Sequence, residues 1–442
     1  MPSDICTRKL LSRTPGLTRS ARVFVAGVAC FSTMGVLATD LAAQAQPAAV
    51  RAPAAPTKNY WVYVGAESAD HIYRVRFGPT GAAVEKAIPI GELAAEMEGP
   101  HGLQISADGK YLYMTTGHGT PDGKYWKYEL GPDTLVGPGV SLGNFPASID
   151  VTPDGLYALS VNFNLHGDMI PSSVSVVYTP NGTEVARIVT CTMPHGSRVS
   201  LDGNHQYSTC MMDDQLVEVD TRAFEVSRRF SLAKGKEGPL PLTAGTMAGM
   251  NHGAMDHSAH AAGGAAPAVK PAGPVIDPAQ VGRAGMGMEK HDMSTPASCS
   301  PTWAQPSAKG DKIFVACNKA DEILEVDTKE WTLTRRIKTG RGVYNLAVTA
   351  DGALMVATLK QGNAVEIYDL ATGASVGVVP TSNRLAHGVT LSPDSRYAFV
   401  SSEGQGAQPG KVDVIDLQAR AKVGTVDVGQ QASGITFWKM SN

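Results

Sequence analysis

Methionine and histidine gather near the middle of the chain, in GTMAGMNHGAMDHSAHAAGG (residues 245–264) and GMGMEKHDMS (residues 285–294). Thioether sulfur is a soft ligand that suits Cu(I), whereas imidazole suits Cu(II) and zinc alike. A tract for zinc alone would have little use for methionine. The alternative is a low-complexity linker in which the methionines are incidental. The candidate copper ligands are Met247, Met250, His252, Met255, His257, His260, Met286, Met288, His291 and Met293.

Three other histidines share a local pattern, His101 and His195 in PHG and His387 in AHG. Three imidazoles that converge can hold a metal ion and leave a further position open for solvent or substrate. The alternative is that the rings only cap backbone groups at the mouth of a channel. Glu403, which follows His387 in the sequence, is a candidate carboxylate ligand beside them.

Four of the six cysteines lie in the main body of the chain. In an oxidising compartment an even number of cysteines at repeated positions indicates disulfides, and four cysteines allow three connectivities. We favour Cys191–Cys210 and Cys299–Cys317, because each pair would lie at one end of one repeat. Thiolate ligation of copper is the alternative. The absence of a Cys-x-x-Cys-His motif excludes covalent c-type haem, and no nucleophile, phosphate-loop or dinucleotide motif occurs.

These residues are carried by a repeated unit, which recurs seven times. Each unit has a strand ending in or near "DG", a second apolar strand, a third ending in "VD" or "DL", and a fourth. His101, His195 and His387 occupy the same position, at the start of the first strand of their units. The seven first strands are GPHGLQISADG, FPASIDVTPDG, MPHGSRVSLDG, SPTWAQPSAKG, GVYNLAVTADG, AHGVTLSPDS and ASGITFWKMSN.

The repeat predicts an all-β fold, a seven-bladed β-propeller. Its strands alternate apolar and polar residues, and glycine in "DG" accepts the positive φ of a tight hairpin. One four-stranded unit cannot bury both of its faces, but seven arranged radially can. The chain enters on a second strand, NYWVYVGAES, and ends on a first strand, ASGITFW. We therefore expect the C-terminal strand to complete the first blade and close the ring.

The repeats resemble the YVTN-type propellers, in which P-x-G-x-x-x-S-x-D-G-x-x-x-Y-V and VIDLxTxxV recur. The resemblance covers roughly residues 58–442 apart from one irregular insert, residues 235–298. It implies the fold and says little of function, because that family includes binding proteins, lactonase relatives and cofactor-bearing reductases. The insert, rich in Pro, Gly and Ala, is predicted to be disordered, and it resembles Met/His-rich stretches of periplasmic copper-resistance proteins.

The N-terminus has the features of an export signal. Five basic residues precede the apolar run VFVAGVACFSTMGVLA, and Ala43-Gln44-Ala45 supplies small residues for cleavage near Ala45. The run is short for a membrane span, and no second one follows. We therefore expect a signal peptide over 1–45, a Pro/Ala linker over 46–57, a propeller over 58–442, and a periplasmic protein without an integral membrane segment after cleavage.

The preferred function is a copper-handling binding protein, whose Met/His insert captures ions over a His-lined face. The insert and the histidines of the second-to-third-strand loops, His71, His118 and His166, are expected on that same face. Zinc is a second candidate metal, and a periplasmic metal-handling protein is the expected partner. The formal charge of −3 gives no case for nucleic acid. The alternatives are a metal- or tetrapyrrole-dependent oxidoreductase that uses the axial histidines, and a protein-interaction scaffold. Whether anything is catalysed stays open.

Overall fold

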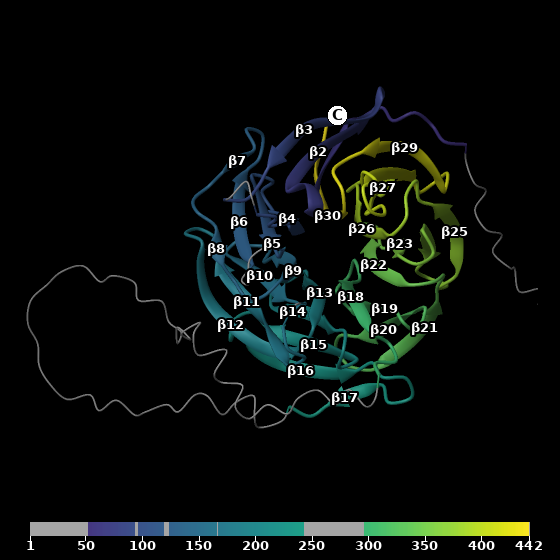
Figure 1. The fold of residues 1–442 in the computed structure, drawn as a ribbon. Helices are drawn as coiled ribbons and strands as arrows, with labels where there is room; N and C mark the ends of the chain where they lie inside the picture. Colours follow the sequence, from purple (N-terminus) through teal and green to yellow (C-terminus); the bar gives the residue numbers. More distant parts are fainter. Residues whose placement is uncertain (1–51, 93–95, 119–122, 166, 243–295, 442) are drawn as a thin grey trace, which may run out of the picture. The chain divides into compact units, whose positions relative to one another are not determined.

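Seven antiparallel sheets follow one another around a central axis, as the repeats predict (Figure 1). The structure, a computed structural model, describes residues 52–92, 96–118, 123–165, 167–242 and 296–441. Each of the seven predicted first strands is the innermost strand of one sheet. The fold is thus a seven-bladed β-propeller, and the prediction of fold class is confirmed.

The first four blades, each given from the axis outwards, contain the following strands. Blade one has β30 (Ala432–Met440), β1 (Tyr60–Ala66), β2 (His71–Gly78) and β3 (Gly81–Pro89), with the 3-10 turn η1 (Glu67–Ala69) between β1 and β2. Blade two has β4 (Pro100–Ile105), β5 (Tyr111–Thr116), β6 (Lys124–Glu129), and both β7 (Thr134–Leu135) and β8 (Val140–Ser141) paired with β6. Blade three has β9 (Pro146–Val151), β10 (Tyr157–Asn162), β11 (Pro171–Tyr178) and β12 (Thr183–Thr192). Blade four has β13 (Pro194–Val199), β14 (His205–Cys210), β15 (Gln215–Asp220), β16 (Glu225–Ser231) and β17 (Gly238–Leu240).

The last three blades have four strands each. Blade five has β18 (Pro301–Pro306), β19 (Lys312–Cys317), β20 (Glu322–Asp327) and β21 (Leu333–Lys338). Blade six has β22 (Val343–Val348), β23 (Leu354–Leu359), β24 (Ala364–Asp369) and β25 (Ser375–Pro380). Blade seven has β26 (Ala386–Leu391), β27 (Tyr397–Ser402), β28 (Lys411–Asp416) and β29 (Ala421–Asp427).

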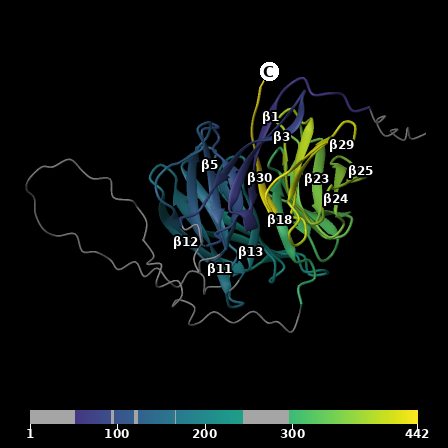
Figure 2. The same cartoon turned by 45° about the horizontal axis from the view of Figure 1, so that its top comes forward.

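The ring closes at blade one, as predicted from the two ends of the chain. The C-terminal strand β30 pairs antiparallel with β1, so that Tyr60 lies opposite Met440 and Ala66 opposite Ala432. Figure 2 shows β30 beside β1. Aromatic rings fill the adjoining interface with blade seven, where Tyr397 packs edge-on at 5.0 Å from Tyr60. Burial of such rings supplies much of the driving force for closure.

The insert differs from its predicted bounds at the N-terminal side. β17 lies within the range 235–298 and adds a fifth strand to blade four, where Leu240 pairs with Arg229. The candidate ligands Met247, Met250, His252, Met255, His257, His260, Met286, Met288, His291 and Met293 all lie outside the described residues. So do the predicted signal peptide and residues 46–51, the first half of the predicted linker. In the part of the chain that is described, no helix is long and apolar enough to span a membrane.

Both favoured disulfides are present. Cys191 is bonded to Cys210 and Cys299 to Cys317, with Cα–Cα distances of 5.8 and 4.5 Å. The first joins β12 of blade three to β14 of blade four, and the second closes the top of blade five. Because all four sulfurs are bonded, these positions offer no thiolate for copper. Two disulfides are in keeping with folding in an oxidising compartment.

Candidate metal centre at the propeller axis

The structure brings the rings of the three repeated histidines together at the axis. His101, His195 and His387 are each the second residue of an inner strand, β4, β13 and β26. The ring centroid of His101 lies 6.2 Å from that of His195 and 5.5 Å from that of His387. All three side chains are buried, at 8, 4 and 6% exposure.

A tyrosine completes this ring of side chains, and sequence reasoning missed it. Tyr344 is the second residue of β22, the same repeat position as the three histidines. Its ring lies 4.8 Å from that of His387, and its hydroxyl is 2.9 Å from Nε2 of His195. The remaining inner strands carry small residues at this position, which leaves space for the four rings. These residues are Ala147, Thr302 and Ser433.

The backbone of the next blade orients the imidazoles of His101 and His195. Nδ1 of His101 is 2.5 Å from the Ala147 carbonyl, and Nδ1 of His195 is 2.9 Å from the Thr302 carbonyl. The equivalent partner of His387 is the Ser433 carbonyl, which acts to raise the pKa of this ring, although Nδ1 makes no hydrogen bond of normal geometry. A carbonyl at Nδ1 fixes the tautomer with its proton there. Nε2 then carries the lone pair that a metal ion needs.

The glycine after each histidine allows this close approach between blades. A Cβ at Gly196 would stand 2.2 Å from the Thr302 carbonyl oxygen, and one at Gly388 would stand 2.7 Å from the Ser433 carbonyl oxygen. Real Cβ atoms do not come this close to backbone oxygen, so a larger residue would push the inner strands apart. The His-Gly pattern therefore sets both the ring orientation and the strand spacing.

A buried carboxylate reaches His101 from blade one. Glu67, the first residue after β1, is 3% exposed, and its Oε1 lies 3.8 Å from Nε2 of His101. Its Oε2 lies 2.6 Å from Nε2 of His118 and accepts a hydrogen bond of 3.0 Å from the Gln431 amide. Burial acts to raise the pKa of Glu67, but His101 and then His118 outweigh it and hold that pKa below its ordinary value. Glu67 is therefore an anion at neutral pH.

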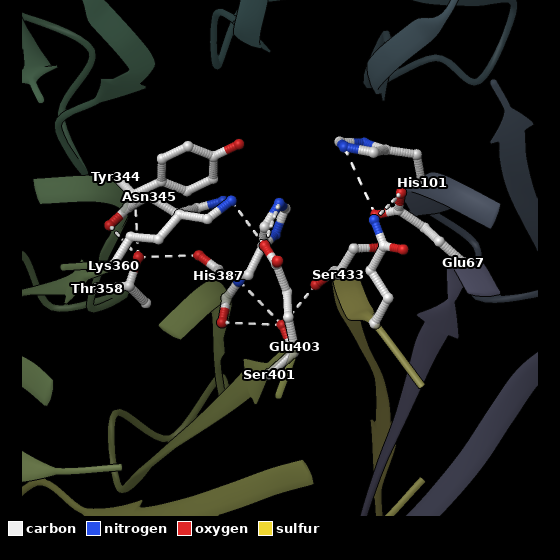
Figure 3. A network of polar contacts seen from close by, with 12 residues as sticks. Glu67, His101, Tyr344, Asn345, Thr358, Lys360, His387, Ser401, Glu403 and Ser433 are labelled. Atoms are coloured by element: carbon white, nitrogen blue, oxygen red, sulfur yellow. Dashed lines mark hydrogen bonds and ion pairs between the residues drawn. The ribbon is translucent and has the colours of Figure 1, made fainter. Parts of the chain in front are cut away.

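An ion pair stands on the other side of His387 (Figure 3). Nζ of Lys360 is 2.6 Å from Oε1 of Glu403, and the same oxygen is 3.8 Å from Nε2 of His387. The ammonium group also lies 4.4 Å from the centroid of the Tyr344 ring. Burial acts to lower the pKa of Lys360, but Tyr344 and Glu403 outweigh it and raise that pKa. Burial, and then the charge of Lys360, hold the pKa of His387 well below its ordinary value.

Two of the predicted histidines and one unpredicted carboxylate lie close enough together that they could hold a metal ion. Ligand atoms of Glu67, His101 and His387 all lie within 4.8 Å of one another, the one such cluster among the residues that the structure describes. The 3.8 Å between Glu67 and His101 is near the about 3.4 Å that separates two ligands of a tetrahedral ion. His195 differs, because Tyr344 occupies its Nε2, and burial lowers its pKa to about 3.

The remaining histidines are placed as follows. His118 contacts the carboxylate of Glu67, which in turn lies near His101. Nδ1 of His71 instead contacts the Ala69 carbonyl at 2.5 Å. His205 lies at the far end of blade four, 4.0 Å from Glu218. His166 lies outside the described residues. The cavity between the axial rings measures about 30 Å3, enough for an ion with a water molecule.

A simple signal in the sequence marks the residues that were missed. Glu67, Lys360 and Glu403 each directly follow the second strand of a blade, in GAES, TLKQ and SSEG. Of these, only Glu403 was singled out from the sequence. Aligning the ends of the second strands, as was done for the starts of the first strands, would place all three around the axis. Tyr344 already stands in the alignment of the first strands, at the same position as the three histidines.

Comparisons with known proteins show the fold and no more. No family model and no curated protein matches the chain. A solved structure of a protein from Lactobacillus plantarum shares 14% identity over 86% of this chain and 100% of that one, with a TM-score of 0.58. A candidate 6-phosphogluconolactonase from Bacteroides fragilis NCTC 9343 shares 12% identity over 87% and 99%, with a TM-score of 0.56. Kuenenia stuttgartiensis hydrazine synthase shares 15% identity over 78% and 98%, with a TM-score of 0.53. At such low identity these similarities show the β-propeller fold alone.

Proposed function

We propose that this protein is an exported copper-handling β-propeller whose axial residues Glu67, His101 and His387 hold the ion. The observation that carries the proposal is the convergence of three buried side chains, whose ligand atoms lie within 4.8 Å of one another. Two imidazoles and a carboxylate form a borderline donor set that suits Cu(II) or zinc. The Met/His-rich insert, rich in the soft thioethers that Cu(I) prefers, makes copper the preferred metal.

The charge of the site supports a cation as its occupant. Glu67 is an anion enclosed by protein, and its partners at the axis are the imidazoles of His101 and His118. A metal ion bound beside it would supply a full countercharge to this buried carboxylate. The small cavity also favours an ion over a tetrapyrrole. The insert would raise the local concentration of copper near the propeller through several weak ligands.

The test is copper binding by the mature chain, residues 46–442, measured by elemental analysis and by electron paramagnetic resonance of the Cu(II) form. The expected spectrum shows nitrogen coupling from two imidazoles. His387→Gln removes one of these nitrogens and should weaken binding by at least about tenfold. His205→Gln, which alters a histidine distant from the axis, is the matched control and should leave both the spectrum and the affinity unchanged.

A second variant separates the axial centre from the insert. Deleting residues 245–293 should lower the number of copper ions bound and leave the axial spectrum in place. If the deletion abolishes all binding, the axial cluster is not a metal site. If neither variant alters copper content, or copper loading yields none, the metal-handling function is wrong. A protein-interaction scaffold is then the better interpretation.

Acid–base groups beside the centre favour one alternative, a metal-dependent oxidoreductase. Tyr344 hydrogen-bonds to His195, and Lys360 pairs with Glu403 within reach of His387. Such groups can deliver protons to a metal-bound substrate. Copper-dependent turnover that is lost in Tyr344→Phe, with copper content unchanged, would establish this alternative. Unchanged turnover in that variant would remove Tyr344 from the reaction.

A further inference from the structure

One of the three axial histidines has a ligand atom whose state the backbone fixes. The Thr302 carbonyl lies 2.9 Å from Nδ1 of His195, and because a carbonyl oxygen can only accept, the ring proton is on Nδ1. The side chain is 4% exposed, and burial, followed by the charge of His101, lowers its pKa to about 3. His195 is therefore neutral at physiological pH, and its Nε2 carries the lone pair that a metal ion needs.

The hydroxyl of Tyr344 takes up this lone pair. The phenol oxygen lies 2.9 Å from Nε2 of His195, and since Nε2 has no proton, the phenol is the donor of the hydrogen bond. Burial raises the pKa of Tyr344, with Lys360 acting in the opposite direction, so the phenol keeps its proton at neutral pH. A metal ion can use Nε2 of His195 only if this hydrogen bond is broken first.

Neighbouring groups hold Tyr344 in place. Its ring centroid lies 4.8 Å from that of His387, and the ammonium group of Lys360 lies 4.4 Å from it on the side shown in Figure 3. The Tyr344 carbonyl accepts a hydrogen bond of 2.7 Å from the Thr302 hydroxyl. Thr302 thus fixes both partners, the ring of His195 through its carbonyl and the strand of Tyr344 through its hydroxyl. The contact between tyrosine and histidine is therefore built into the packing of three adjacent blades.

Apart from this contact, His195 is placed much as the histidines of the proposed centre are. Its ring centroid lies 6.2 Å from that of His101, whereas the corresponding distance for His387 is 5.5 Å. All three rings line the same axial cavity. The hydrogen bond to Tyr344, together with the slightly larger separation, leaves His195 out of the cluster of ligand atoms that lie within 4.8 Å of one another. Three imidazoles around one ion would otherwise be within reach of this architecture.

We propose that Tyr344 withholds His195 from the bound copper ion, limits the centre to two imidazoles and one carboxylate, and so keeps the ion exchangeable. The inference rests on the proposed function, because it concerns how firmly the axial centre holds copper. A third imidazole would add a ligand that Cu(II) prefers. A protein that passes its ion on has to release it, and fewer strong ligands mean faster dissociation. Tyr344 is in this sense a positioning residue, since it acts on the ion through His195.

The test is Tyr344→Phe in the mature chain, loaded with one equivalent of Cu(II). This variant loses the hydroxyl and keeps the ring beside His387. We expect the electron paramagnetic resonance spectrum to change from two coupled nitrogens to three, the dissociation constant to fall at least about tenfold, and transfer of copper to a chelator to slow by a similar factor. A purely structural role of the hydroxyl predicts the opposite sign, because a lost hydrogen bond loosens the site. Tyr60→Phe, which removes a phenol hydrogen bond to Asp394 at the far end of the inner strands, is the matched control and should change none of the three.

A double-mutant cycle assigns the gain to His195. In the Tyr344→Phe background, His195→Gln should abolish both the third nitrogen and the tighter binding, whereas in the wild-type background it should cost far less affinity than His387→Gln does. Thermal unfolding checks that each variant is folded, and should the double variant not fold, the nitrogen count of Tyr344→Phe decides alone.

The outcomes separate this inference from the proposed function. If the wild type binds copper at the axis and Tyr344→Phe shows two nitrogens and no gain in affinity, the inference is wrong and the proposed function stands. If neither chain binds copper at the axis, both are wrong. A phenolate-to-copper absorption band in the wild type that Tyr344→Phe removes would make the tyrosine itself a ligand and would also overturn the inference.

Discussion

Removing the charge of Lys360 should tighten copper binding while destabilising the metal-free protein. Nζ of Lys360 and Nε2 of His387 lie 2.6 and 3.8 Å from the same Glu403 oxygen, so they are no more than about 6.4 Å apart. At an effective dielectric constant of about 20, two unit charges at that distance interact by about 2.6 kcal/mol. A copper ion bound to Nε2 of His387 would be repelled by the Lys360 ammonium group, although Glu67 partly neutralises the charge of the ion. Removing this repulsion should raise the affinity for Cu(II) by a factor of about 10–100.

The substitution of choice is Lys360→Leu, because leucine has no atom that could bind copper. It also releases Glu403 from its ion pair and leaves that carboxylate near His387. Breaking this partly buried pair costs folding free energy, though less than the about 3–5 kcal/mol of a fully buried pair. We therefore expect a lower melting temperature without metal and a lower dissociation constant for Cu(II).

Competition with a chromophoric chelator, at fixed pH and ionic strength, measures the affinity. Lys360→Arg keeps the charge and is the matched control, with an affinity close to that of the wild type. Circular dichroism confirms the fold of both variants. Weaker binding, or no change, in a folded Lys360→Leu variant would refute both the electrostatic reasoning and the placement of the ion beside His387.

Three further predictions concern the architecture around the site. The pKa of His195 is lowered from 6.5 to about 3, so the buried ring contributes stability above pH 6.5. This stability, up to about 5 kcal/mol, is lost as the pH falls from 6.5 towards 3. In urea unfolding of the metal-free protein, the free energy of unfolding of His195→Gln should therefore fall less steeply with decreasing pH than that of the wild type. Gly196→Ala should cost about 1–3 kcal/mol and weaken copper binding, because the new Cβ meets the neighbouring blade. Gly238→Ala, with nothing within 4 Å of its Cβ, should do neither. Replacing either disulfide by two serines should cost about 3 kcal/mol in urea unfolding, as expected for loops of 19 and 18 residues; a cost below about 1 kcal/mol for both would contradict the pairing as a stabilising feature.

The repeat made the fold predictable. Each blade repeats the same alternation and the same turn, so seven weak local signals agree on one architecture. Ring closure was predictable because the chain begins on a second strand and ends on a first strand. The disulfides were predictable because two pairs of cysteines stand at matching repeat positions. The extra strand β17 was missed because its three residues, GPL, have no apolar alternation.

The site was only half predictable, for a geometric reason. His101 and His387 were found because they share one repeat position, but Glu67 reaches the axis from a different position, the end of a second strand. A periodic pattern compares equivalent positions and cannot show which non-equivalent ones meet in space. His195 stands out in the sequence as clearly as the other two, yet Tyr344 occupies its ligand atom, a contact that only the folded ring creates.

The ring has a seam, and the proposed copper ligands lie on both sides of it. Glu67 follows β1, among the first strands to be made, whereas His387 belongs to the last blade, and β30 carries Ser433 between His101 and His387. An ion bound by all three ligands would therefore link the first and last blades where the ring closes. A chain that crosses a membrane amino end first presents Glu67 early and β30 last. If the protein is exported and binds copper as proposed, its axial ligands would come together only once translocation is complete, and loading of the centre would follow the last step of folding.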